Sequence, residues 1–382
     1  MELIVLLLGY LFALFGTGLF LYALWKLIRT HAIRERIVEF ARSLGLLREH
    51  GNPILVPRGQ GWEAGGVMNP AAIEAGGRVH LFYRAVGNDG VSRIGYASSK
   101  NGASFDERLP YPVFALAGGD DATRRFAEHS GLSKSGGSFA GVEDPRAVVI
   151  GDRMYMTFSV FGGWDALRIG VSSIAISDLL AKRWKWTAPT YLSPVGQVHK
   201  NWVLFPEKIN GKFAVLHSLH SGSRDRVLVD YLDTLDENAS IESPYNPVKD
   251  ESVWDSTLRG AGPPPIKTKD GWLLFYHATD AREPSRYKLG ALLLDLTDPT
   301  KVIARSPFPI LSPDATYENE GFKSGVVYAC GATVHGDTLT VYYGGADSVV
   351  CAAKISLSEF LKKLKDKKMA RLTPVPLRFS AA

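Results

Sequence analysis

Residues 202–218 read WVLFPEKINGKFAVLHS, in which two β-rich runs flank the dipeptide Asn210-Gly211. Asn-Gly between two such runs is a strong signal for a β-hairpin, because both residues accept the left-handed backbone of a tight turn. The stretch therefore predicts a strand, a two-residue turn and a second strand.

Four more pairs of β-rich runs with Gly-containing turns lie on either side of this hairpin. They are 67–73 with 79–85, 147–150 with 154–160, 263–268 with 272–278, and 325–334 with 338–344. A further β-rich run often follows, at 93–98, 168–173, 227–232 and 289–295. Small antiparallel sheets repeated along a chain are typical of a β-propeller, which hides most strand edges. We therefore expect an all-β domain over residues 52–355, as a propeller rather than the alternative β-sandwich.

The N-terminal segment has a different character. Residues 3–25 contain no charged side chain, and the first basic residue is Lys26. An apolar stretch of about 20 residues is long enough to cross a membrane as a helix. Glu2 precedes the stretch and no clear cleavage site follows it, which favours a retained helix over a signal peptide. We expect a transmembrane helix at 1–28 and a basic juxtamembrane linker helix at 29–51.

The basic residues after the apolar stretch also predict an orientation, because positive flanks stay on the cytoplasmic side of a membrane. They are Lys26, Arg29, Arg34 and Arg36. The expectation is a single-pass protein of the inner (cytoplasmic) membrane, with most of the chain in the cytoplasm. The lipid bilayer, and its anionic head groups in particular, would then be a partner.

Composition excludes several other classes. The 44 Lys and Arg residues exceed the 39 Asp and Glu residues by little, and no basic stripe interleaved with aromatics crosses the middle of the chain, so nucleic-acid binding is not expected. The two cysteines, Cys330 and Cys351, form neither a disulfide framework nor a metal-ligand pattern. No metal and no organic cofactor is expected.

Residues 356–382 are expected to form a C-terminal helix and tail, with Ser356 and Glu359 as its capping box.

Short polar strings interrupt the apolar runs near the starts of the units. They are Asn69-Pro70, the string 143–146, Lys200-Asn201 and the string 260–263. In a propeller the inner strands of all blades end at one mouth, so polar groups far apart in sequence meet in one pocket. This pocket is the default candidate for a binding or catalytic site.

Five short sequence strings match the pattern of a known enzyme family. They are GVEDPR at 141–146, LFPEKINGK at 204–212, GAGPPP at 260–265, DGWLLFYH at 270–277 and YYGGAD at 342–347. Over residues 52–353 the chain resembles glycoside hydrolase family 130, the β-mannoside phosphorylases and related mannosidases. The resemblance implies a five-bladed propeller, in agreement with the five units, and inverting cleavage of β-mannosidic bonds.

The resemblance also implies roles for individual residues. Asp144 would be the catalytic acid, because a glycosidic bond needs its leaving oxygen protonated. Lys200, Asn201 and His277 would bind inorganic phosphate, the co-substrate that attacks the sugar and leaves as mannose 1-phosphate. One carboxylate then suffices, since phosphate already carries the negative charge that a base would create.

Sugar recognition would fall to residues that match the family's substrate-binding positions. These are Asn69, Arg84 and Asp347, with Glu143 beside the acid and Trp62 as a residue that stacks on a sugar face. Four of the candidate residues also have a purely structural interpretation. Asp144 before Pro145 suits a turn, a lysine such as Lys200 suits a solvated loop, and His277 and Trp62 suit packed aromatic positions.

One departure from the family pattern leaves the nucleophile open. Family phosphorylases usually have Leu-His-Arg in the third unit, with the Arg on phosphate, whereas this chain has Leu-His-Ser at 216–218. Arg224 or Arg226 would have to replace that Arg, or water would be the nucleophile, as in the family's β-mannosidases. Water needs a base, and the candidates are Asp230, Glu318 and Glu320. A non-catalytic, membrane-tethered glycan-binding propeller is a further alternative.

Overall fold

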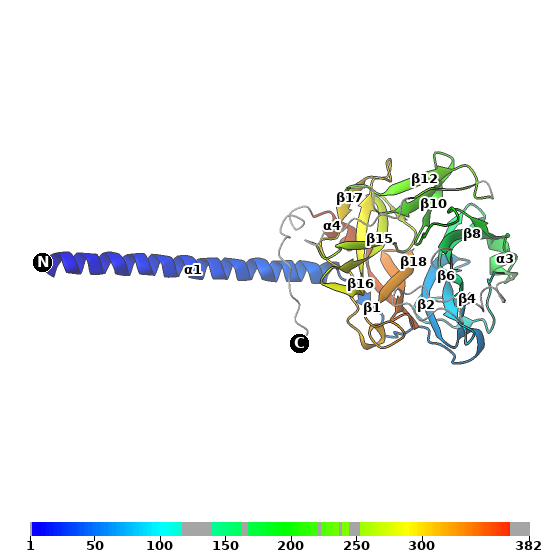
Figure 1. Cartoon of the computed structure of the whole chain (residues 1–382), viewed down its shortest axis with the longest axis horizontal. Coiled ribbons are helices and arrows are strands. Elements are labelled where there is room, and N and C mark those ends of the chain that lie inside the picture. The colour runs from blue at the N-terminus through cyan, green and yellow to red at the C-terminus, as the bar shows by residue number, and fades with distance from the viewer. Residues whose placement is uncertain are drawn as a thin grey trace.

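The computed structural model describes residues 2–116, 140–161, 167–219, 223–236, 239–243 and 253–366. Strands dominate these residues, and helices are confined to the N-terminal segment and a few short stretches (Figure 1). The predicted all-β class of the main domain is confirmed.

The strands form five antiparallel units in chain order. Unit 1 comprises β2 (Gly66–Ala75), β3 (Arg78–Val86), β4 (Val91–Ser99) and β5 (Glu107–Arg108). Unit 2 comprises β6 (Ala140–Ile150), β7 (Arg153–Phe161), β8 (Leu167–Ala175) and β9 (Thr190–Tyr191). Unit 3 comprises β10 (Val203–Ile209), β11 (Lys212–Ser218) and β12 (Leu228–Leu232). A short parallel pairing of β4 with β6 joins units 1 and 2 into one sheet.

The last two units contain the remaining strands. Unit 4 comprises β13 (Thr257–Ala261), β14 (Ile266–Thr268), β15 (Gly271–Asp280), β16 (Glu283–Leu294) and β17 (Val302–Arg305). Unit 5 comprises β18 (Val327–His335), β19 (Thr338–Gly345), β20 (Val349–Ser356) and β1 (Leu47–Arg48). Short helical turns lie between strands at η1 (Gly61–Glu63), α3 (Ile176–Leu180) and η2 (Thr316–Glu318).

All five predicted hairpins are present as antiparallel pairs: β2 with β3, β6 with β7, β10 with β11, β14 with β15, and β18 with β19. The third-strand runs are also strands, as β4, β8, β12 and β16. Unit 4 differs from the prediction, because β13 pairs with β15 beyond the short β14. This pairing brings the string 260–263 alongside His277.

The first and last units meet. Strand β1 pairs with β20 and gives unit 5 an outer strand from the start of the chain. Strand β18 packs on β2 so closely that a Cβ on Gly331 would lie 2.5 Å from the backbone nitrogen of Ala72. Glycine at position 331 therefore allows β18 and β2 to come into contact.

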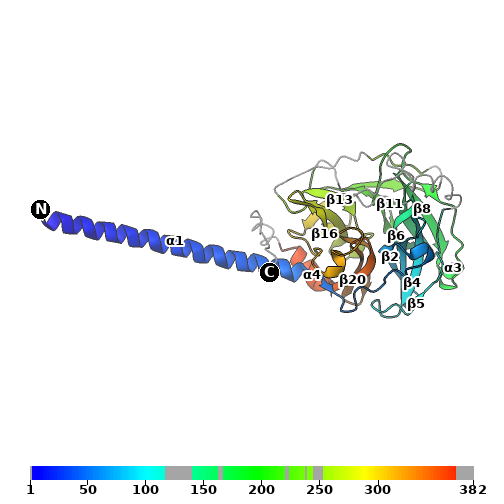
Figure 2. The same ribbon diagram turned by 60° about the horizontal axis from the view of Figure 1, so that its bottom comes forward.

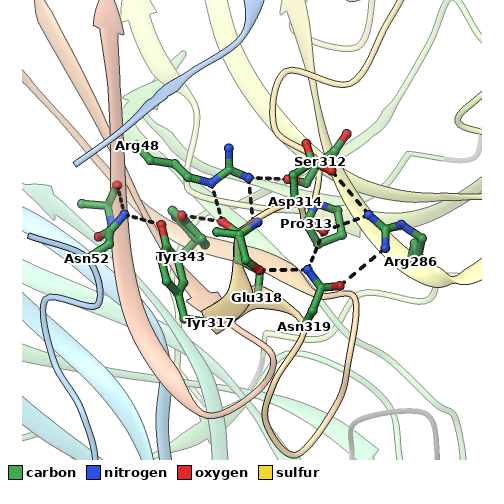
Figure 3. Close-up of polar contacts among 12 residues, drawn as sticks. Arg48, Asn52, Arg286, Ser312, Pro313, Asp314, Tyr317, Glu318, Asn319 and Tyr343 are labelled. Carbon is green, nitrogen blue, oxygen red and sulfur yellow. Dashed lines mark hydrogen bonds and ion pairs between the residues drawn. The ribbon is translucent and has the colours of Figure 1, made fainter. Parts of the chain in front are cut away.

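A buried ion pair holds β1 in place (Figure 3). Arg48 donates from Nε to Glu318 Oε1 at 2.8 Å and from Nη2 to Glu318 Oε2 at 2.7 Å. The Glu318 side chain is fully buried and also accepts a hydrogen bond from the Tyr343 hydroxyl at 2.8 Å. All its strong acceptor positions are therefore used by the fold.

The N-terminal segment is one helix, α1 (Glu2–Leu44), which projects from the strands in both views (Figures 1 and 2). The transmembrane helix expected at 1–28, the bilayer partner and the inner-membrane location are wrong. Among the residues that the structure describes, no helix is both long and apolar enough to cross a membrane.

The C-terminal end of α1 packs against the last helix of the described chain. Helix α4 (Leu357–Leu364) begins at the predicted cap, where Ser356 Oγ accepts from the Glu359 backbone N–H at 3.3 Å. Its apolar face is buried in the same core as Leu44, and Lys363 Nζ donates to the Ser43 carbonyl at 3.0 Å. The expected tail after residue 366 lies outside the described residues.

Replacing Arg48 by Met should destabilise the protein by about 3 kcal/mol, because Glu318 would stay buried without its cation. Urea denaturation followed by tryptophan fluorescence measures this loss. Lys267→Met is the control, since Lys267 pairs with Glu207 where both side chains are about half exposed. That change should cost less than about 1 kcal/mol. Equal losses in the two variants would contradict a structural role for the buried pair.

Candidate active site

Two of the polar strings lie where strands β2 and β6 break register with their partner strands. Strand β2 shifts between Met68 and Ala71, and β6 shifts between Glu143 and Arg146. At these bulges Asn69 and Asp144 have φ values of 49° and 50°. Each is followed by proline, which has no N–H to lose from the ladder. A bulge redirects side chains, and left-handed backbone at non-glycine residues is typical of functional sites.

The two bulges bring their side chains together. Asn69 Nδ2 donates to Asp144 Oδ1 at 2.7 Å, and Arg84 Nη1 donates to the same oxygen at 3.3 Å. Asp144 is 4% exposed and Arg84 is 2% exposed. Both hydrogen bonds fall on Oδ1, so one edge of the carboxylate is committed to the protein.

Glu143 shares the same arginine. Arg84 Nη2 donates to Glu143 Oε1 at 2.7 Å, and Lys200 Nζ lies 3.8 Å from Glu143 Oε2. Glu143 is fully buried, whereas the Lys200 side chain is 21% exposed. Lys200 is therefore the member of this group that reaches the solvent-accessible side.

The surrounding cations have different effects on the pKa values of Glu143 and Asp144. Burial raises the pKa of Glu143, and the opposing charges of Arg84 and Lys200 do not cancel that rise. Burial would also raise the pKa of Asp144, but Arg84, Arg146, Lys200 and the Asn69 hydrogen bond together lower it below its usual value. Asp144 is thus an anion in the unliganded protein.

A second hydrogen-bond network lies beside the first. Arg146 donates to the Asp144 carbonyl at 2.8 Å and to Asn201 Oδ1 at 2.7 Å. The Tyr328 hydroxyl also donates to Asn201 Oδ1 at 2.7 Å, and Asn201 Nδ2 donates to the Arg259 carbonyl at 2.8 Å. Asn201 has a φ of 65° and is the third polar residue in left-handed backbone here.

His277 is fully buried against this network. Its ring stacks on Tyr328 with centroids 3.9 Å apart, and the Ala329 N–H donates to its Nε2 at 2.9 Å. Burial, with a further contribution from Arg146, lowers the pKa of His277 to about 3. The ring is therefore neutral with its proton on Nδ1, and Nδ1 has no hydrogen-bond partner among the described residues.

Asp347 joins the cluster from the turn between β19 and β20. Ala346 and Asp347 both have left-handed φ values, 48° and 50°, as a tight hairpin turn requires. Burial raises the pKa of Asp347, opposed by the charges of Lys323 and Arg84. Segments that lie far apart in the sequence thus supply one buried, charged cluster.

The sequence profile of glycoside hydrolase family 130, described as β-1,4-mannooligosaccharide phosphorylase, matches residues 62–366. The chain belongs to glycoside hydrolase family 130. The resemblance read from the five sequence strings is confirmed.

Individual family 130 relatives align over nearly their whole length. The chain is 38% identical to a 1,2-β-oligomannan phosphorylase of a Thermoanaerobacter species, over 82% of this chain and 98% of the relative. It is 36% identical to a β-1,2-mannobiose phosphorylase of the same organism, over 81% and 97%. The solved β-1,2-mannobiose phosphorylase of Listeria innocua, in complex with β-1,2-mannobiose, matches with a TM-score of 0.63 at 26% identity, over 84% of this chain and 99% of that one.

Most of the family 130 residues expected at the site are brought together. Direct contacts join Asn69, Arg84, Glu143, Asp144 and Lys200. Asn201 and His277 connect through Tyr328, and Asp347 interacts through its charge with Arg84, Asp144 and Lys200.

Trp62 lies apart from this cluster. Its Nε1 donates to the Pro110 carbonyl at 3.0 Å, and its ring stacks on Tyr83 at 6.4 Å. No contact within the described part of the chain joins it to Asp144.

Sequence reasoning missed four residues of the cluster. Arg146, Arg259, Lys323 and Tyr328 were not assigned roles, although Arg146 stands in the 141–146 string and Arg259 directly precedes the 260–265 string. Lys323 Nζ lies 4.2 Å from the centroid of the Tyr287 ring, and Arg259 Cζ lies 5.1 Å from the same centroid. No sequence signal marks Lys323, which lies in a loop and matches no quoted string.

The neutral state of His277 has a measurable consequence. Between about pH 6.5 and pH 4 the unfolded chain takes up a proton on this histidine that the folded chain does not, so stability falls as pH decreases. Wild type should lose about 1.4 kcal/mol more per pH unit in this range than His277→Gln. Urea denaturation at a series of pH values measures the slopes, with His335→Gln, at an exposed histidine, as control. Identical slopes for wild type and His277→Gln would contradict the assignment.

Proposed function

We propose that this chain cleaves β-1,2-mannosidic bonds by phosphorolysis, with Asp144 as the proton donor. The observation that carries the proposal is the convergence of Asp144, Arg84, Asn69 and Lys200 in one buried cluster. The two relatives that align over 98% and 97% of their length are named for β-1,2-linked substrates, which favours this linkage over β-1,4.

We further propose that the five units are the blades of one propeller. Neighbouring units contact each other around a ring, through β2 with β6, β6 with β10, β10 with β14, β16 with β18, and β18 with β2. This arrangement accounts for the meeting of polar strings from different units.

In the proposed reaction a phosphate oxygen attacks the anomeric carbon from the face opposite the leaving group. The bond from that carbon to the glycosidic oxygen breaks, and the proton of Asp144 passes, through a sugar hydroxyl as in the family, to the departing oxygen. A β-mannoside therefore gives α-mannose 1-phosphate and a sugar shortened by one unit. Asn69, Arg84, Glu143 and Asp347 would orient the sugar, while Lys200, Asn201 and His277 would hold phosphate.

The candidate bases for attack by water have no contact with the Asp144 cluster among the described residues, which favours phosphate. Glu318 is bound to Arg48, Tyr343 and the Ala315 N–H. Asp230 is 52% exposed and lies 3.5 Å from His217 Nε2. Glu320 is exposed. Because none of the three contacts the Asp144 cluster within the described residues, the single-carboxylate mechanism fits the site better.

Product analysis tests the proposal directly. β-1,2- and β-1,4-mannobiose and a β-1,2-oligomannan are incubated with and without phosphate, and products are separated by mass spectrometry. Mannose 1-phosphate from the β-1,2 substrates, formed only with phosphate, is expected. Free mannose formed at full rate without phosphate would replace this proposal with hydrolysis. Binding of mannobiose without product would replace it with the non-catalytic alternative.

Asp144→Asn should lower kcat by about 10² to 10⁴, the usual contribution of general acid catalysis, because Asn cannot donate the proton. Phosphate-dependent release of mannose 1-phosphate is the measurement, and far-UV circular dichroism verifies the fold. Asp230→Asn is the matched control and should retain activity. Activity in Asp144→Asn equal to wild type would refute the assignment of the acid.

Asn69→Gly tests how the pKa of Asp144 is controlled. The substitution keeps the left-handed backbone but removes a hydrogen bond that stabilises the ionised carboxylate, so the pKa of Asp144 rises. Because the acid acts only when protonated, the alkaline limb of the kcat–pH profile should move up by about one pH unit.

Asn210→Gly is the control for this change, since Asn210 is a left-handed residue in an exposed turn. Its profile should match wild type at saturating mannobiose and phosphate. An alkaline limb in Asn69→Gly that stays in place or moves down would contradict the role of this hydrogen bond.

A further inference from the structure

The residues expected to bind phosphate carry little positive charge. Asn201 is neutral, and its amide group already bonds Arg146, Tyr328 and the Arg259 carbonyl. His277 is neutral and fully buried. Lys200 is therefore the one cation in the set, whereas phosphate sites normally use several charge-assisted hydrogen bonds.

The arginine that family phosphorylases usually have in the third unit is not replaced by its sequence neighbours. The position is occupied by Ser218. Arg224 binds both oxygens of the buried Asp255, at 2.7 and 2.8 Å. Arg226 is exposed and contacts Thr300 and Asp298. Neither arginine is thus available to phosphate.

Arg259 lies next to two of the expected phosphate-binding residues, His277 and Asn201. Strand β13 pairs Leu258 with Ala278 and Gly260 with His277, so Arg259 is the extra residue of the bulge opposite His277. Its carbonyl accepts the hydrogen bond from Asn201 Nδ2 at 2.8 Å. Arg259 therefore stands between two of the expected phosphate-binding residues.

The side chain of Arg259 has an unsatisfied donor within the described residues. Its guanidinium packs on the Tyr287 ring, and its Nε is buried without a hydrogen-bond partner among the described residues. No carboxylate of the described residues forms an ion pair with it. A buried guanidinium N–H without an acceptor is costly, and an anionic ligand would satisfy it.

A glycine next to Arg259 permits this arrangement. Gly260 has a φ of 131°, and a Cβ on it would lie 2.6 Å from Asn201 Nδ2. The close approach of β13 to Asn201 thus needs glycine, and it brings the Arg259 side chain to the edge of the Asp144 cluster. Burial raises the pKa of Tyr287. The positive charges of Arg259 and Lys200 oppose this rise, and the negative charge of Asp347 adds to it.

We infer that Arg259 binds the phosphate co-substrate and takes the place of the arginine that is absent at position 218. The inference rests on the proposed phosphorolysis and extends it by naming the second cation. Phosphate would then lie between Lys200 and Arg259, with both cations stabilising its charge as it attacks the sugar.

Steady-state kinetics with separately varied phosphate and β-1,2-mannobiose test this inference. Arg259→Gln should raise the KM for phosphate roughly tenfold to hundredfold, the value of one charge-assisted hydrogen bond. The KM for mannobiose should stay within about twofold, because the sugar contacts are untouched. Arg259→Lys keeps the charge and should lie between wild type and Arg259→Gln. Arg226→Gln is the control and should match wild type.

The outcomes separate the inference from the proposed function. Wild-type cleavage that does not depend on phosphate overturns both. Phosphate-dependent wild type with an unchanged KM for phosphate in Arg259→Gln overturns only the role of Arg259. A rise confined to the KM for mannobiose assigns Arg259 to the sugar and also overturns it. If Arg259→Gln does not fold, Arg259→Lys and calorimetric titration of inorganic phosphate give the same comparison.

Discussion

The buried interaction of Arg84 with Glu143 and Asp144 is the constraint on which the site depends. A guanidinium that is 2% exposed has to be compensated by nearby negative charge, because an unpaired charge in a low-dielectric interior is very costly. Two adjacent carboxyls on unit 2 supply that charge, and Arg84 on unit 1 supplies the cation for both. The interaction therefore holds units 1 and 2 in register while it positions Asp144, the proposed acid.

Backbone geometry makes this interaction possible. An unbroken β2 or β6 would point neighbouring side chains to opposite faces. The bulges at Asn69 and Asp144 remove that restriction, and each costs about 1 to 3 kcal/mol of local strain. Asn and Asp tolerate left-handed backbone better than most residues, and the following prolines suit strand positions without a ladder donor. The same residues that provide the chemistry are thus those that the bulges accept.

Local signals in the sequence predicted the hairpins, because Asn-Gly, Asp-Gly and Gly-Asp turns act within a few residues. The gathering of Asn69, Asp144 and Lys200 was predictable from their shared place near the start of each unit, whereas Arg84 was predicted only from the family resemblance. No site role was predicted for Arg259 and Lys323, since a single charged residue near a strand end normally indicates a side chain in contact with solvent. The Arg48–Glu318 pair joins residues 270 positions apart, and no local pattern encodes it; Glu318 consequently looked like a candidate base. The apolar run at residues 3–25 predicted a membrane-spanning helix. That prediction is contradicted, because no helix among the described residues is long and apolar enough to cross a membrane.

The balance of charge around Asp144 explains why the site suits an anionic nucleophile. The charges of Arg84, Arg146, Lys200 and Lys323 act on three carboxyl groups, and burial raises the pKa of two of these, Glu143 and Asp347. The cations therefore exceed the carboxylates, and the excess lowers the pKa of Asp144 and keeps it ionised. A phosphate dianion bound among these cations would offset them and raise the pKa of Asp144 toward the protonated form that an acid needs. Water carries no charge and would leave Asp144 ionised, so in the proposed mechanism the electrostatics that attract phosphate would also couple its binding to the activation of Asp144.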